Sequence, residues 1–208
     1  MTIRFAAFAL SIAALAACAS TPPGPPQLEA VWTTIGFDEP ESVILSAEND
    51  FLYVSNVAGE GDERDGEGYI SKVSLEGVVL ERRWAEGLDG PKGMALDGAG
   101  LLWVSDINRL VALDAETGRL RESHVIGPAR FLNDAARLPD GTIVVADSGT
   151  GTIFSKTANG HSTWLKDDLL ESVNGLLPQE ERLLVTTMEG RLLAVDYATK
   201  QIGVLVEG

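Results

Sequence analysis

The sequence predicts an all-β fold of the β-propeller type, built from repeats of one small sheet. Four short pairs recur along the chain, and the last three follow one another at intervals of 41 residues. The pairs are Glu41-Ser42, Lys92-Gly93, Asn133-Asp134 and Asn174-Gly175. A period of about 40 to 45 residues is typical of propeller blades, each of which buries its faces only against its neighbours.

Each repeat also contains a turn between two apolar runs. The turns contain Asn49-Asp50, Asp97-Gly98, Asp140-Gly141 and Glu180-Glu181; the runs that follow them are 51–54, 101–104, 142–145 and 183–185. These runs end at Asn56, Asp106, Asp147 and Met188, and a further apolar run follows at 70–73, 110–113, 153–154 and 192–195. Asp-Gly between apolar runs is a strong hairpin signal. We therefore expect strand, tight turn, strand, turn and strand in each unit, with little helix.

The first interval, from Glu41 to Lys92, is longer by ten residues, and the insertion is easily located. Gly59–Gly68 reads GEGDERDGEG, which is acidic and rich in glycine. Such a segment cannot bury apolar area, so we expect a solvated loop outside the blade. A calcium loop is the alternative, but Asp62, Glu63 and Asp65 do not have the spacing of an EF-hand loop.

The N-terminal segment predicts export and lipidation. Residues 1–17 carry one cation, Arg4, and then apolar runs too short for a permanent membrane span, as in a signal peptide. The segment ends in Leu15-Ala16-Ala17-Cys18, which resembles a bacterial lipobox, and Cys18 is the only cysteine. Residues 18–30 contain four prolines and predict an extended linker. An ordinary cleavable signal with a chance cysteine, or a buried thiol, is the alternative.

Lipidation at Cys18 would place the protein in the bacterial cell envelope. Ala19 rather than Asp after the cysteine resembles lipoproteins sorted to the outer membrane, so we expect the protein on that membrane, facing the periplasm. Contact with the membrane is then expected through the lipid anchor only. The folded part is expected to be 31–208.

Composition excludes several classes of function. The chain has a formal charge of −15, which disfavours binding to nucleic acid. Neither a G-x-S-x-G elbow nor a G-x-G-x-x-G or Walker A loop occurs. We therefore expect no nucleotide cofactor. Zinc is disfavoured because His124 and His161 are isolated in the sequence.

Several of these segments together resemble the SMP-30/gluconolactonase/LRE-like family. The resemblance rests on Glu41-Ser42-Val43, Gly90-Pro91-Lys92-Gly93-Met94, Phe131-Leu132-Asn133-Asp134 and Val173-Asn174-Gly175, and covers about residues 31–208. Members are six-bladed propellers with a divalent cation, commonly calcium, on the central axis. Their known activities include hydrolysis of lactones and organophosphate esters.

The resemblance implies roles for particular residues. Glu41 and Asn174 would be metal ligands, and Asn133 would contact substrate. The repeat geometry agrees with these roles, because equivalent positions of successive blades converge at one end of the central channel. Carboxylate and amide oxygens suit Ca²⁺ or Mg²⁺. Ca²⁺ is the expected cofactor, with Mg²⁺, Mn²⁺ and Zn²⁺ left open.

Each of these residues also has a purely structural interpretation, since Asn, Asp and Gly commonly form turns before strands. Asp134 is either a turn former or a catalytic carboxylate. Lys92 occupies the matching position of the second blade, where it could bind an anionic substrate. The expected function is a metal-dependent lactone or ester hydrolase with a small-molecule substrate. The alternatives are a non-catalytic binding propeller and an inactive fragment.

The number of repeats departs from the resembled family. Residues 31–208 supply about four blades, whereas the family has six and takes its third metal ligand, an Asp, from a fifth. We expect a fragment of a longer chain or a truncated product, with a closed four-bladed ring as the remaining option. An open ring would leave apolar blade faces unpaired.

Overall fold

The computed structural model describes residues 28–208, in which Trp32–Gly208 forms one compact unit. The predicted signal peptide, Cys18 and all but the last three residues of the predicted linker lie outside the described residues. Within 28–208 no helix is long and apolar enough to cross a bilayer.

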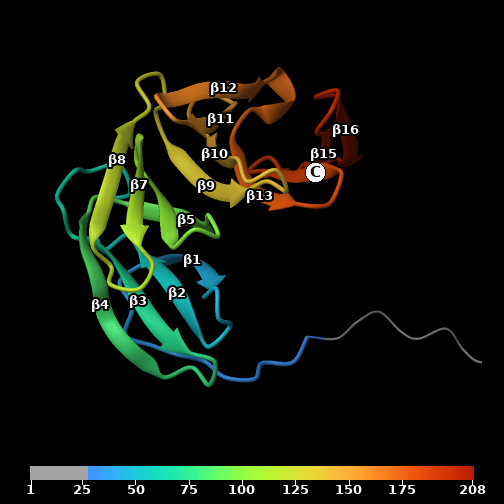
Figure 1. The fold of residues 1–208 in the computed structure, drawn as a ribbon. Coiled ribbons are helices and arrows are strands. Elements are labelled where there is room, and N and C mark those ends of the chain that lie inside the picture. Colours follow the sequence, from blue (N-terminus) through green and yellow to red (C-terminus); the bar gives the residue numbers. More distant parts are fainter. Residues whose placement is uncertain (1–27) are drawn as a thin grey trace, which may run out of the picture. The chain divides into compact units, whose positions relative to one another are not determined.

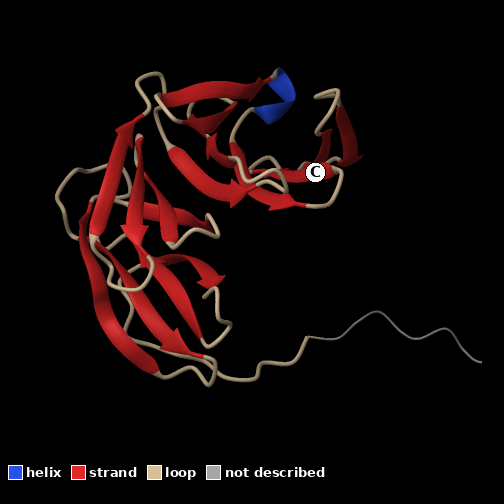
Figure 2. Cartoon of the chain, viewed as in Figure 1, coloured by secondary structure: helices blue, strands red, loops and turns tan. Residues whose placement is uncertain are grey.

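Four antiparallel sheets of four strands each follow one another along the chain (Figures 1 and 2). In each sheet the strands lie in the order in which they occur in the sequence. Blade 1 contains β1 (Pro40–Leu45), β2 (Phe51–Asn56), β3 (Gly68–Ser74) and β4 (Val79–Leu88). Blade 2 contains β5 (Pro91–Leu96), β6 (Leu101–Asp106), β7 (Arg109–Asp114) and β8 (Leu120–Val125). Blade 3 contains β9 (Leu132–Arg137), β10 (Ile143–Asp147), β11 (Thr152–Thr157) and β12 (Gly160–Lys166). Blade 4 contains β13 (Val173–Pro178), β14 (Arg182–Thr187), β15 (Leu192–Asp196) and β16 (Ile202–Val206).

The prediction of three strands for each unit was wrong, because every blade has a fourth, outer strand. β8 shows why the sequence hides it: Leu120–Val125 is mostly exposed and reads LRESHV, without an apolar run. An outer strand needs no buried face, so its signal is weak. The prediction of little helix agrees with the structure, since the described residues contain one short 3₁₀ turn, η1 (Asp168–Leu170).

A second correction concerns the end of the second strand in blade 4. Asn56, Asp106 and Asp147 end β2, β6 and β10, as predicted. In blade 4 the equivalent residue is Thr187, because it pairs with Val173 at the start of β13. Met188, which we expected there, lies one residue beyond the strand.

Apolar cores fill the spaces between successive blades. Tyr53 of blade 1 packs with Leu102 and Val104 of blade 2. Trp103 of blade 2 packs with Ile143 and Val145 of blade 3, and a third core joins blades 3 and 4. The innermost strands β1, β5, β9 and β13 are neighbours in this order, which brings the first strand of every blade to a common centre (Figure 1).

The outer faces of blades 1 and 4 expose apolar side chains at positions where the equivalent residues of blades 2 and 3 are buried. The fourth residue of the innermost strand is 60% exposed in blade 1 (Val43) and 5% exposed in blade 2 (Met94). The fifth residue is 60% exposed in blade 4 (Leu177) and 5% exposed in blade 3 (Ala136). The two terminal faces of Trp32–Gly208 thus have the composition of an interface between blades.

Candidate functional site

All four pairs occupy the same place in the fold. They are the second and third residues of the innermost strands, where each strand begins at the centre of the molecule. The second residues are Glu41, Lys92, Asn133 and Asn174, and the third residues are Ser42, Gly93, Asp134 and Gly175. The predicted site residues are therefore brought to one end of the four innermost strands.

Each pair forms a β-bulge. In blade 1 the strand register passes from Pro40–Asn56 to Val43–Val54, so two residues of β1 lie opposite the single residue Ser55. The other blades have the same arrangement: the two residues of each pair lie opposite a single residue of the second strand, which is Ser105, Ala146 or Thr186. Bulges turn side chains out of the regular alternation and are common beside active sites. The pairs lie inside strands and not in turns. The structural interpretation nevertheless holds in part for Asp134, whose carboxylate accepts hydrogen bonds from two backbone N–H groups.

Hydroxyl groups from the second strands hold three of these bulges. Ser55 Oγ accepts a hydrogen bond from Ser42 N at 3.0 Å, and Thr186 Oγ1 accepts one from Gly175 N at 3.0 Å. Ser105 Oγ donates to Gly93 O at 3.2 Å, and Asn133 O is also within its reach. These three hydroxyl residues were not predicted from the sequence. Each is the next-to-last residue of its second strand, and this repeated position could have indicated them.

Asp134 lies where three innermost strands meet. Its Oδ2 accepts a hydrogen bond from Leu176 N of β13 at 2.7 Å, and its Oδ1 accepts one from Ala135 N at 2.8 Å. A Cβ on Gly93 of β5 would come within 2.2 Å of Asp134 Oδ1, so only glycine leaves room for the carboxylate. Burial raises the pKa of Asp134 to about 6, against the lowering effect of the two N–H groups.

Glu41 and Lys92 influence each other electrostatically. Although the Glu41 side chain is exposed, neighbouring protein atoms withdraw water from its carboxyl group and raise its pKa. The charge of Asp134 raises this pKa further, and Lys92 lowers it. Burial lowers the pKa of Lys92, while Glu41, Asp106 and Asp62 oppose that change. This end of the strands is thus a cluster of carboxylates with one buried cation.

The two asparagines differ in accessibility. Asn133 is buried, at 6% exposure, whereas Asn174 is half-buried. Beyond them a hollow of about 520 Å³ runs between the innermost strands, with Ser42, Met94, Asp134 and Leu176 among its lining residues. Asp134 therefore lines the hollow and is also adjacent in sequence to Asn133, one of the four second residues of the innermost strands.

The acidic insertion is a loop outside the sheet, as predicted, with Gly68 as the first residue of β3. It is not a freely solvated loop, however. The carbonyl of Gly61 accepts a hydrogen bond from Lys92 Nζ at 3.0 Å. Lys92 Nζ also lies over the aromatic ring of Phe131, at 4.4 Å from the ring centroid. The sequence alone had indicated no role for Phe131.

The donor set at this end of the strands fits a hard divalent cation in chemical type. Glu41 offers a carboxylate, and Asn133 and Asn174 offer amide oxygens, which Ca²⁺ accepts. Burial is the main cause of the raised pKa of Glu41 and the charge of Asp134 adds to it, so a bound cation would favour the ionised form of the Glu41 carboxyl group. Within 28–208, no group of three Asp, Glu, His or Cys side chains converges as a ligand set, so the amides would have to take part.

Comparison with known families and with curated proteins finds no match. Solved structures do match. Virginiamycin B lyase from Staphylococcus aureus shares 14% identity over 79% of this chain and 54% of its own, with a TM-score of 0.60. The calcium-binding protein regucalcin from Agrobacterium tumefaciens shares 20% identity over 71% of this chain and 52% of its own, with a TM-score of 0.53. The β-propeller domain of Cps50 (Swd1) from Myceliophteria thermophila shares 15% identity over 84% and 58%, with a TM-score of 0.56.

The chain has the β-propeller fold. Four successive four-stranded sheets and the likeness to known propellers agree on this, and the predicted fold class is confirmed. At these identities the likeness shows the fold alone. The chain spans about half the length of the virginiamycin B lyase and regucalcin structures that it matches. The roles predicted for Glu41, Lys92, Asn133, Asp134 and Asn174 stay predictions.

Proposed function

We propose that this propeller is a divalent-cation-dependent hydrolase of lactone or other ester bonds. The observation that carries the proposal is the repeated bulge, which brings Glu41, Asn133 and Asn174 to equivalent places on three innermost strands. Bulged positions next to the centre of a propeller are suited to aiming side chains at a ligand. The likeness to calcium-binding regucalcin supports a divalent cation, and Ca²⁺ is the cation proposed.

Glu41 and Asn174 are the residues proposed to hold the cation, since one supplies a carboxylate and the other is an accessible amide. A cation there would supply Lewis acidity to the ester carbonyl and favour the ionisation of water. Asn133 is proposed to donate a hydrogen bond from its side-chain amide to the substrate. Its fixed position between β5 and β13 would orient the ester against the second residues of the innermost strands.

Asp134 is the proposed proton acceptor. With a pKa of about 6 it is largely ionised at neutral pH, and such a value is close to the optimum for a base that works near neutrality. Each of its oxygens has one backbone N–H partner, which leaves each oxygen a further lone pair. The two hydrogen bonds fix the carboxylate at the edge of the hollow.

The test is hydrolysis of a panel of lactones and aryl esters by the purified protein, before and after EDTA treatment and after Ca²⁺ is restored. We expect activity that EDTA abolishes and Ca²⁺ restores. Glu41→Gln and Asn174→Ala should reduce it by more than about tenfold, since loss of even a hydrogen-bond partner of a metal ligand costs about 10- to 100-fold. The matched controls Glu76→Gln and Asn159→Ala, both in exposed turns, should retain it. Activity that survives EDTA would refute metal dependence, and binding without turnover would favour the non-catalytic alternative.

We also propose that the protein is a lipoprotein of the bacterial envelope, anchored through Cys18. The support is the sequence Leu15-Ala16-Ala17-Cys18 at the end of an apolar leader. Mass spectrometry of the N-terminal peptide from membranes should find a diacylglyceryl cysteine as the first residue. Cys18→Ser should release the protein from the membrane fraction. An unmodified Cys18 in the mature protein would contradict the anchor.

A further inference from the structure

The acidic segment between β2 and β3 is tied down at several points. Val57 N donates to Glu39 O and Ala58 N to Asp38 O, both at 3.1 Å, where the segment leaves the sheet. Further along, Arg64 Nη2 donates to Asn108 Oδ1 at 2.7 Å, in the turn between β6 and β7. The segment therefore crosses from blade 1 to blade 2 at the end where the innermost strands begin.

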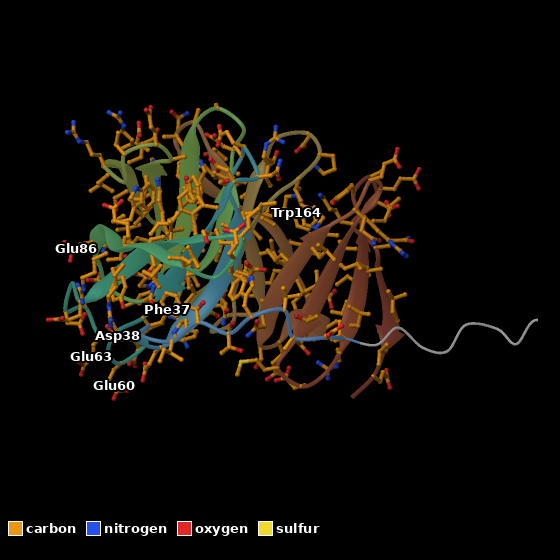
Figure 3. The ribbon with its side chains drawn as sticks, turned by 90° about the horizontal axis from the view of Figure 1, so that it is seen from below. Phe37, Asp38, Glu60, Glu63, Glu86 and Trp164 are labelled. Atoms are coloured by element: carbon orange, nitrogen blue, oxygen red, sulfur yellow. The ribbon has the colours of Figure 1, made fainter. Side chains whose placement is uncertain are left out.

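The charge of this segment faces outward. Residues 59–68 contain five acidic residues and one arginine. Figure 3 shows the Glu60 and Glu63 side chains on the outside of the ribbon, at the same end as Asp38. The backbone side of the segment, by contrast, packs inward: a Cβ on Gly61 would lie 3.8 Å from Lys92 Nζ and 4.0 Å from Phe131 Cζ.

Lys92 is the inward partner of the segment. Its Nζ donates to Gly61 O at 3.0 Å and to Gly90 O at 3.1 Å, and lies over the ring of Phe131. The residue is only 4% exposed. An ammonium group covered by two carbonyls and an aromatic face is a poor partner for an anionic substrate, because its charge is already compensated.

Gly90 explains how the two segments come so close. A Cβ on Gly90 would lie 3.0 Å from Gly61 O and 3.4 Å from Lys92 Nζ, which is tighter than an ordinary contact. At Gly61 the same addition meets only ordinary van der Waals distances. The contact between the acidic loop and the start of blade 2 thus requires that residue 90 has no side chain, whereas a methyl group at residue 61 can be accommodated.

We propose that residues 57–67 form a lid over the candidate site at the start of the innermost strands, and that Lys92 is the positioning residue that latches this lid through Gly61. Lys92 acts on the site through the lid and through the field that it exerts on Glu41, without touching the substrate. The charges of Glu41, Asp62 and Asp106 act on Lys92. Asp106 also has Arg109 as a partner, so removal of the ammonium group takes a nearby cation chiefly from Glu41 and Asp62. The identity of the site as a hydrolase rests on the proposed function, but the latch can be tested without turnover.

Hydrogen exchange measured by mass spectrometry tests the latch in the full chain. In Lys92→Met, amides of residues 59–66 should exchange about tenfold faster or more, the factor expected when a charge-assisted hydrogen bond is lost. Lys156→Met is the matched control, since Lys156 also lies over an aromatic ring, Trp103, but in another part of the molecule. It should leave the loop unchanged. Equal exchange in wild type and Lys92→Met would overturn the proposal.

Trypsin provides a second readout that leaves the ammonium group of Lys92 in place. Arg64 is the only basic residue of the loop, so cleavage after Arg64 reports opening of the lid. Gly90→Ala should accelerate this cleavage, whereas Gly61→Ala should not, and intact mass will locate the cut. If Gly90→Ala and Gly61→Ala are cut at the same rate as wild type, the contact is not a latch, even if Lys92→Met fails to fold.

Kinetics separate the lid from the proposed chemistry. On an active ester, Lys92→Met should raise KM severalfold and change kcat little, and Lys92→Arg should restore part of the loss. An effect on kcat alone would contradict a positioning role for Lys92. If the protein hydrolyses no ester, the proposed function fails, while the exchange and cleavage results still decide whether the lid exists.

Discussion

Asp134 of blade 3 accepts a hydrogen bond from the backbone N–H of Leu176 in blade 4, with 2.7 Å between Oδ2 and the nitrogen. This bond joins two innermost strands at the centre of the propeller. The same carboxylate is packed against Gly93 of blade 2, so one side chain contacts three blades.

The first prediction concerns pH. Because the pKa of Asp134 is raised from 3.8 to about 6, the folded state binds its proton more tightly than the unfolded state does. The stability that this group contributes is fully present below about pH 4 and is lost as pH rises through 6, a change of roughly 3 kcal/mol. Urea unfolding at several pH values should show this fall in wild type relative to Asp134→Asn.

The control for this effect is Asp140→Asn, in an exposed turn where hydrogen bonds to Thr142 lower the pKa of the carboxyl group. The ionised Asp140 carboxyl group stabilises the folded state near neutral pH, and this stabilisation is lost as pH falls. A difference curve between wild type and Asp134→Asn that stays flat from pH 4 to 7 would show that Asp134 has an ordinary pKa.

The second prediction concerns the close approach of blades 2 and 3. Gly93→Ala would place a Cβ 2.2 Å from Asp134 Oδ1 and 2.4 Å from Asp134 Cα. Since the backbone itself would have to move, we expect a loss of about 3 kcal/mol or more in the free energy of unfolding. Gly127→Ala, where an added Cβ meets nothing within 4 Å, should change it by less than about 0.5 kcal/mol. Equal effects of the two substitutions in urea titrations would count against the close packing.

The third prediction contrasts two adjacent leucines of β13. Leu176 is 7% exposed in the core between blades 3 and 4, whereas Leu177 points to the open face of blade 4. Leu176→Ala should destabilise the protein by about 2 to 5 kcal/mol, as for other buried leucines. Leu177→Ala should cost less than about 1 kcal/mol. If Leu177→Ala proved the more costly in thermal or urea unfolding, the open face of blade 4 would have to be covered in solution.

The repeat spacing was sufficient to predict the propeller and the common location of the site residues. Successive pairs at a fixed spacing, each followed by a hairpin signal, had to fall at equivalent points of successive blades. The outer strands were missed, since residues such as those of Leu120–Val125 bury little and carry no periodic apolar signal. The bulges were missed as well, because bulge formation depends on pairing across the sheet, which the sequence of one strand does not specify.

The surroundings of Lys92 could not be read from the sequence for a related reason. Its partners, Gly61 and Phe131, come from an insertion and from another blade, and both contacts exist only in the folded chain. Composition predicted a loop for residues 59–68 because charge and glycine disfavour a core. Composition alone could not show that a carbonyl of this loop would cover a buried ammonium group.

Glu41 and Asn174 belong to a single cation site in the proposed function, although they lie 133 positions apart in the sequence. The most direct test is calorimetric titration with Ca²⁺ of wild type, Glu41→Gln, Asn174→Ala and the double variant. We predict saturable binding by wild type, and a double variant that loses less affinity than the sum of the single losses, with a coupling of about 1 kcal/mol or more. Absence of Ca²⁺ binding by wild type, or strictly additive losses, would contradict a shared site.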